Sequence, residues 1–237
     1  MSVQGHGCRW LVVALVLAAL RQAHAVEGAE EERRDSPSLV PRGAGGAVAL
    51  AWIDPSDGAS GLFAWASDEA SGILRELGVE ARWRRGSPRE IGRPGEIRVI
   101  LVLSPARSST GELVLGATLA NDGEAPVVWI HVSHVREMLG PAAPRPAAMS
   151  DLRVAGLVGV ALGRVIAHEL VHCLAPGLPH GKGLMSRRLG SHALVGTRMS
   201  FGPEVAEAIR AAQQGERASA PADRIVLTAT VGEEGVR

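Results

Sequence analysis

Apolar residues along the chain fall into runs and repeats that predict alternating strands and helices. Residues 47–53 and 97–103 are almost wholly apolar, as in buried strands, and residues 79–83 alternate as a half-buried strand does. Over residues 60–77, apolar side chains recur every three or four positions, which predicts a helix. Gly78 follows this helix directly, and glycine is the residue type that most often ends a helix.

The second half of the chain predicts a hairpin followed by a long helix. Apolar runs at residues 113–119 and 126–135 flank an Asn-Asp-Gly turn at residues 121–123. A helical pattern then runs over residues 150–175, until a Pro-Gly pair stops it. Glycines inside this helix lower its propensity, so we expect them to allow close packing against the sheet. They are Gly156, Gly159 and Gly163.

Two further elements complete the pattern and fix the expected fold class. Residues 200–214 predict a final helix, and residues 225–231 predict a strand near the end of the chain. The order of elements indicates a mixed α/β (α+β) fold. We expect a mostly parallel, twisted sheet with an antiparallel edge strand, a helix that backs the sheet, and the long helix that carries the candidate site.

The first 25 residues have the pattern of an export signal. Arg9 precedes an apolar stretch over residues 10–20, and Ala23-His24-Ala25 is a small-x-small cleavage motif. The stretch is shorter than the about 20 residues that span a bilayer. We therefore expect cleavage after Ala25 and a secreted or periplasmic protein without stable membrane insertion; the alternative is an uncleaved membrane anchor.

The remaining chain divides into three expected parts. Residues 26–46 are polar and rich in Gly and Pro, which indicates a flexible leader. Residues 47–215 hold the predicted elements and form the expected catalytic domain. Residues 216–237 form a C-terminal tail that contains the last predicted strand.

Composition narrows the possible functions. Among 237 residues, 25 Lys and Arg balance 25 Asp and Glu, so the net charge of zero excludes a polybasic nucleic-acid binder. There is no Tyr, which excludes a mechanism that needs a tyrosine hydroxyl. Of the two Cys, Cys8 lies in the signal, so Cys173 has no partner for an intramolecular disulfide. We expect Cys173 to be a small buried apolar residue.

The long predicted helix carries the chemistry. His168 and His172 lie four residues apart, on one face of the helix, where both imidazoles can bind one Zn²⁺. Glu169 between them is placed to accept a proton from a metal-bound water rather than to ligate the ion. The alternative interpretation is an amphipathic helix with two ordinary histidines.

A catalytic zinc site needs a third protein ligand and an open fourth position. His180 is the candidate, because the Pro-Gly pair at residues 176–177 ends the helix and lets the chain turn back. Glu204, near the start of the last predicted helix, is the competing candidate. His131 and His134 are three apart in a predicted strand, so we expect them to face opposite sides, at the surface.

At these residues the sequence resembles the metzincin zinc metallopeptidases, above all small exported bacterial zincins with a displaced third histidine. In that family a His-Glu-x-x-His helix precedes a glycine turn, a third His and a turn that places a methionine under the metal. Here Ala175 holds the family's glycine position, and the glycine and third His come two residues later. The matching residues are His168, Glu169, His172, Gly177, His180 and Met185.

The resemblance implies a secreted zinc-dependent metalloendopeptidase, that is, a hydrolase of peptide bonds with Zn²⁺ as cofactor and Glu169 as base. It implies a peptide or protein substrate that lies antiparallel to an edge strand, which we expect at residues 127–132. Two alternatives remain: a non-catalytic zinc-binding module of the same fold, and an exported interaction protein without a metal. The sequence indicates no oligomeric state and no substrate specificity.

Overall fold

The computed structural model of the chain describes residues 46–90, 92–103, 113–120, 125–140, 152–196, 200–214 and 224–231, the last of these by their backbone alone. The predicted signal peptide, nearly all of the predicted leader and the hairpin turn at residues 121–123 lie outside the described residues.

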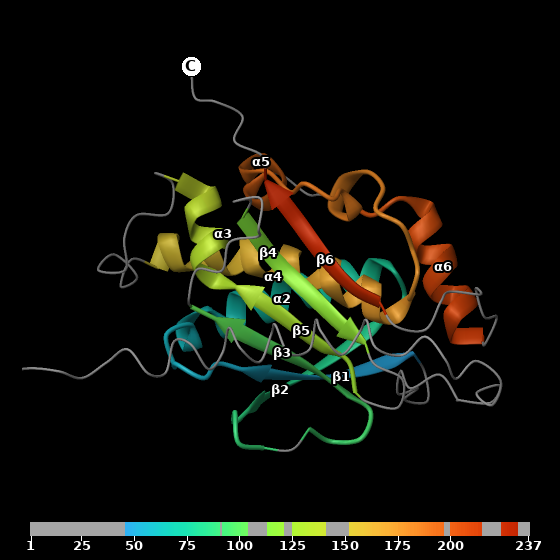
Figure 1. Ribbon diagram of the computed structural model, residues 1–237, viewed down its shortest axis with the longest axis horizontal. Coiled ribbons are helices and arrows are strands. Elements are labelled where there is room, and N and C mark those ends of the chain that lie inside the picture. The colour runs from blue at the N-terminus through green and yellow to red at the C-terminus, as the bar shows by residue number, and fades with distance from the viewer. Residues whose placement is uncertain are drawn as a thin grey trace, which may run out of the picture. The chain divides into compact units, whose positions relative to one another are not determined.

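A six-stranded sheet forms the centre of the fold, with the strand order β2-β1-β3-β5-β4-β6 (Figure 1). The first four strands in this order run parallel to one another, and β4 pairs antiparallel with both β5 and β6. The sheet is therefore mixed and mostly parallel, as predicted. Its strands are β1 Ala47–Ile53, β2 Glu80–Gly86, β3 Glu96–Val102, β4 Leu113–Ala120, β5 Val127–His131 and β6 Arg224–Val231.

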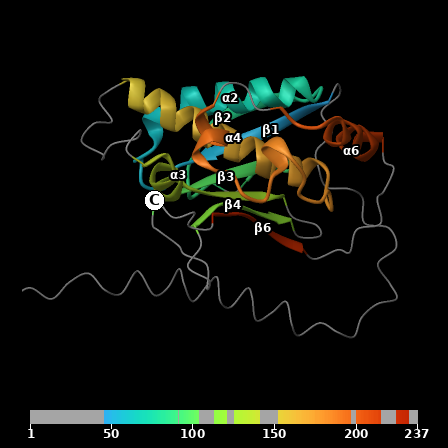
Figure 2. The same ribbon diagram turned by 90° about the horizontal axis from the view of Figure 1, so that it is seen from above.

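Two helices, α2 and α4, lie side by side and pack against one face of the sheet (Figures 1 and 2). Helix α4 contacts β4 and β5, and α2 contacts β2. The helices are α2 Phe63–Glu76, α3 Val132–Leu139, α4 Leu152–Leu174, α5 Ser191–Val195 and α6 Pro203–Gln214, with short 3₁₀ turns η1 Ser60–Leu62 and η4 Gly183–Met185.

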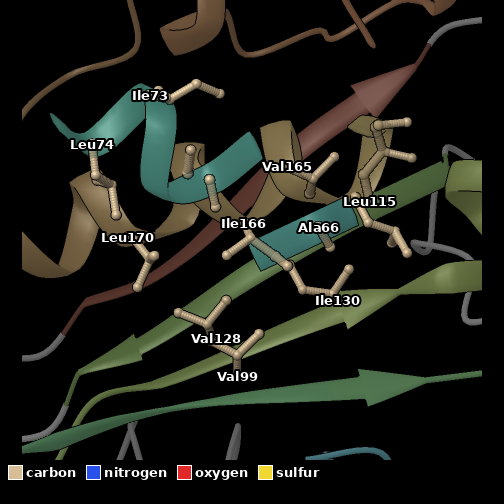
Figure 3. Packing of buried hydrophobic residues seen from close by; sticks show 14 of the residues in the cluster. Ala66, Ile73, Leu74, Val99, Leu115, Val128, Ile130, Val165, Ile166 and Leu170 are labelled. Carbon is tan, nitrogen blue, oxygen red and sulfur yellow. The ribbon is translucent and has the colours of Figure 1, made fainter. Parts of the chain in front are cut away.

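The core lies between α4 and the sheet. Figure 3 shows Ile166 and Leu170 of α4 above Val99, Val128 and Ile130 of the central strands, and all five side chains are buried. Burial of each such side chain stabilises the fold by about 1.5–3 kcal/mol. By length and hydropathy alone, α4 could span a membrane. However, 83% of its most apolar stretch is buried inside this fold, as in the core helix of a folded domain.

The local pattern predicted most boundaries correctly. The predicted strands at residues 47–53 and 97–103 are β1 and β3, and the predicted helix over residues 60–77 is η1 followed by α2. Gly78 has a φ of +77°, which confirms it as the residue that ends α2 in a left-handed conformation. The strand expected at residues 225–231 is β6, which joins the sheet beside β4.

The glycines of α4 pack closely, but against a helix rather than against the sheet as predicted. A Cβ on Gly159 would lie 2.3 Å from the Cβ of Trp65, and one on Gly163 would lie 2.7 Å from the carbonyl oxygen of Ala66. Both neighbours belong to α2. The two helix backbones therefore approach more closely than any larger residue at these positions would allow.

The hairpin prediction is confirmed in its pairing and wrong in its extent. Strands β4 and β5 pair antiparallel, but β5 ends at His131 and residues 132–139 form α3. Val132, Val135 and Leu139 are all buried, at the spacing of one helix face. The prediction extended the apolar run of β5 through Val135, although the spacing of three and four residues fits a helix and not the alternation of a strand.

The expected edge strand at residues 127–132 is also wrong. Strand β5 pairs with β3 on one side and with β4 on the other, so it lies inside the sheet. The antiparallel strand beside α4 is β4, and its outer neighbour is β6. Any strand that adds to the sheet near the candidate site must therefore be considered at β4.

Candidate metal centre

Three histidines converge at the C-terminal end of α4. His168 and His172 lie one helical turn apart, and their Nε2 atoms are 3.3 Å apart. The ring of His180 lies 5.4 Å from that of His168 and 4.9 Å from that of His172, measured between ring centroids. One nitrogen from each ring lies within 4.8 Å of the other two. The sequence prediction that these three residues come together is confirmed geometrically.

The loop after α4 brings His180 back to the helix. Gly177 has a φ of +87°, a conformation that glycine adopts without strain, and Leu178 N–H donates to the carbonyl of Ala175 across the turn. On the far side of His180, Gly181 N–H donates to the carbonyl of Met185 at 2.8 Å. These backbone hydrogen bonds hold the loop in the conformation that places the ring of His180 beside those of His168 and His172.

The same loop orients His168. Its Nδ1 lies 2.5 Å from the carbonyl oxygen of Leu184, which can only accept, so Nδ1 carries the proton and Nε2 presents its lone pair to the other rings. Met185 follows Leu184 in the 3₁₀ turn η4 and is buried. The methionine turn beneath the metal that the resemblance implies stays a prediction.

Burial keeps the His168 ring neutral. His168 is 0% exposed, and its removal from water lowers the pKa of the ring to about 4, against the opposing effect of the Leu184 hydrogen bond; a charge on nearby His180 lowers it further. A neutral imidazole is the form that binds a metal ion. The site therefore holds at least one ring ready for ligation at neutral pH.

The cluster has the donor set of a zinc site, and one pair of its donors has the spacing that zinc requires. Ligands at about 2.0–2.1 Å from a tetrahedral Zn²⁺ are separated from one another by about 3.3 Å. The Nε2 atoms of His168 and His172 already have this separation. Three imidazoles leave one tetrahedral position open, as in catalytic zinc sites. Glu204, the competing candidate, is exposed at the start of α6 and is not part of the cluster.

Glu169 lies against β4. Its side chain is 0% exposed, and the Thr118 hydroxyl donates to Glu169 Oε2 at 2.8 Å while also lying 3.1 Å from the Glu169 carbonyl oxygen. Gly116, two residues earlier on β4, faces the same carboxylate: a Cβ there would lie 2.7 Å from Oε1. Strand β4 therefore sets the position of the carboxylate.

Sequence reasoning missed both of these β4 residues. The strand reads Leu-Val-Leu-Gly-Ala-Thr-Leu-Ala. Gly116 and Thr118 are two residues apart, so both face the same side of the strand, where one has no side chain and the other carries a hydroxyl. Glycine within a strand often marks the close approach of another group. That signal was available, but the partner lies 51 residues from Thr118 in the sequence, and no local pattern identifies it.

The other predicted histidines have different roles. His134 was expected at the surface, opposite to His131, but it lies in α3, is fully buried, and its Nδ1 lies 2.7 Å from the carbonyl of Val114. Its ring stacks on that of His131 at 5.3 Å, because the change from strand to helix brings both to one side. His192 lies exposed on α5.

Cys173 is buried, as expected from its place on α4. Burial raises the pKa of its thiol far above the usual range, and the neighbouring Glu169 raises it further, against a hydrogen bond with Thr118. The thiol is therefore protonated and shielded, and it has the properties of a small core residue.

Comparisons with known proteins give one structural similarity. No family model and no curated protein matches the chain. The chain is similar to the crystal structure of an archaemetzincin from Methanopyrus kandleri, with 16% sequence identity, a TM-score of 0.48, and coverage of 74% of this chain and 99% of that chain.

Proposed function

We propose that the chain is a zinc-dependent metallopeptidase that is exported from the cell and hydrolyses peptide bonds. The observation that carries the proposal is the convergence of three imidazole nitrogens, two of them from α4, the helix that also carries Glu169. The spacing of the first two nitrogens supports Zn²⁺ as the ion, with His168, His172 and His180 as its ligands.

Zinc, when bound, would supply Lewis-acid activation of the attacking water and of the substrate carbonyl. The protein residues supply position and proton transfer. Glu169 accepts the proton of the attacking water and passes it to the leaving amine nitrogen. Thr118 holds the carboxylate in place through its hydroxyl, and Leu184 fixes the ring of His168.

The substrate main chain is expected beside β4. This strand carries two residues that lie against Glu169, namely Gly116 and Thr118. An extended peptide that pairs with a strand presents its carbonyl groups at regular positions along that strand. The scissile carbonyl would then come to the cluster without a dedicated side-chain clamp.

A non-catalytic zinc-binding module is the second candidate. The observation that favours it is the burial of Glu169, whose carboxylate accepts the Thr118 hydroxyl hydrogen bond instead of facing bulk water. A module of this kind would bind zinc for stability and would release no peptide products.

The two candidates differ in an assay of the zinc-loaded full chain on a peptide library, with elemental analysis of the same sample. We expect one zinc per chain and new peptide termini by mass spectrometry. Glu169→Gln should retain the zinc and lose the cleavage, whereas Glu204→Gln, at an exposed carboxylate outside the cluster, should retain both. Cleavage that persists in Glu169→Gln would exclude Glu169 as the base.

A further inference from the structure

We infer that β6 is an internal occupant of the substrate edge. This strand, from the C-terminal region of the chain, pairs with β4 where a peptide substrate would pair, and it slows substrate binding by competing for that edge. The inference rests on the proposed function for its biological meaning. The occupancy itself is a property of the fold and is tested separately from catalysis.

The first observation is the register of β6. It runs antiparallel to β4 over the whole strand, from Leu113 opposite Val231 to Ala120 opposite Arg224 (Figure 1). Figure 2 shows the same neighbourhood from a second direction. A peptide that adds to a sheet edge uses this main-chain pairing.

The second observation is that this part of β4 is the part that contacts the base. Gly116 is opposite Thr228 of β6, and Thr118 is opposite Val226. Both β4 residues touch Glu169. Adjacent strands lie about 4.8 Å apart, so the backbone of β6 passes within one strand spacing of the residues that hold the carboxylate.

The third observation is that β4 has no second edge to offer. Its inner side pairs with β5, where Gly116 is opposite Ile130 and Thr118 is opposite Val128. The outer side pairs with β6. A strand has two edges for hydrogen bonding, so a substrate strand and β6 compete for the same one.

The fourth observation concerns which occupant can leave. Strand β5 is held between β3 and β4, but β6 is the last strand in the sheet order, and among the described strands it pairs with β4 alone. Its sequence, Arg-Ile-Val-Leu-Thr-Ala-Thr-Val, is rich in β-branched residues and contains no proline or acidic residue. It has the composition of a strand that adds to an edge, and its release disrupts one ladder only.

The experiment uses the full chain with Val226→Pro and Leu227→Pro together. Successive residues of a strand point their N–H groups to opposite sides, so one of the two prolines must remove a bond to β4. Val236→Pro, beyond the last residue of β6, is the matched control. A second variant, with Val226, Thr228 and Thr230 each changed to Gly, weakens the strand while every N–H group is kept.

Two readouts decide the inference without any catalysis. Hydrogen exchange by mass spectrometry should show amides of residues 113–120 exchanging at least about tenfold faster in both variants than in the wild type and the control. A synthetic peptide with the sequence of residues 224–231 should bind the variants and not the wild type. Equal exchange in all four proteins, or equal peptide binding by the wild type, would overturn the inference.

Peptide cleavage by the same zinc-loaded proteins separates this inference from the proposed function. We expect both variants to cleave a peptide library at least about tenfold faster than the wild type, because the edge is open to the substrate. If the variants bind the peptide and contain zinc but cleave nothing, the proposed hydrolytic function fails and the occupancy of the edge stands. If the wild type cleaves as fast as the variants, β6 does not compete with the substrate.

Discussion

Gly116 of β4 lies so close to Glu169 of α4 that a Cβ on residue 116 would come within 2.7 Å of Oε1 and 2.9 Å of Cγ. The absence of a side chain at this position is what lets the carboxylate lie between the helix and the strand. Since Thr118 donates to the other carboxylate oxygen, the two β4 residues together define where the proposed base is.

Gly116→Ala should displace the Glu169 carboxylate. The added methyl group meets a fully buried side chain that has little room to move, and overpacking of this kind costs about 1–3 kcal/mol. We expect a lower free energy of unfolding in urea and loss of peptide cleavage, with zinc content unchanged. Gly190→Ala is the control, because nothing lies within 4 Å of a Cβ at that position. Equal behaviour of the two variants would contradict the steric role of Gly116.

Thr118→Val should remove the hydrogen bond to Glu169 without changing the shape of the side chain. A hydrogen bond to a charged group contributes about 1.5–3 kcal/mol, and the buried carboxylate would lose it. We expect destabilisation of this size in denaturant titrations, together with a lower kcat at unchanged KM. Thr118→Ser keeps the hydroxyl and should restore most of both quantities; if it behaves like Thr118→Val, the hydroxyl is not what matters.

His180→Ala should weaken zinc binding at least about 100-fold, because loss of a direct ligand costs more than the tenfold to hundredfold that loss of an outer partner costs. Competition with a chromogenic chelator measures this directly. His192→Ala, at an exposed position outside the cluster, should bind zinc as the wild type does. Wild-type affinity in His180→Ala would remove His180 from the ligand set.

Cys173 should not react with thiol reagents in the native chain. It is 1% exposed, and burial raises the pKa of its thiol, so the reactive thiolate is scarce. In a Cys8→Ser chain, we expect no release of the chromophore from Ellman's reagent under native conditions and one equivalent in denaturant. Rapid labelling of the native chain would show that the C-terminal half of α4 opens to solvent.

Acid should destabilise the metal-free chain through His168. Burial lowers the pKa of its ring from 6.5 to about 4, so between these values the unfolded chain binds a proton that the folded chain does not. Protonation of His168 therefore does not reduce the free energy of unfolding above about pH 6.5. As the pH falls from there towards 4, this one group lowers the free energy of unfolding by about 3 kcal/mol at most. Urea titrations at several pH values should show a shallower fall in His168→Gln, and an identical fall would assign the acid sensitivity to other residues.

Local periodicity predicted much of the fold and the main features of the site. Strands β1 and β3 and helices α2, α4 and α6 follow from apolar spacing, because each buries one face or stripe on the core. The convergence of His168 and His172 follows from the helix pitch, and the Pro-Gly pair correctly indicated that the chain returns with His180.

Contacts between distant parts of the sequence account for what was not predicted. Thr118 and Glu169 meet because α4 lies on β4, and β6 joins β4 after about a hundred intervening residues. The buried residues of α3 follow helical spacing, which the apolar run that continues from β5 obscured. The glycines of α4 indicated close packing, but only the assembled fold shows that the partner is α2.

The short loop after α4 contributes twice to the histidine cluster, through the ring of His180 and through the Leu184 carbonyl that binds His168. In the proposed zinc-loaded chain, ion binding and the ordering of this loop would therefore be coupled. Chelation should loosen the loop as a whole, and a protease that nicks residues 176–186 would report the degree of metallation without any substrate.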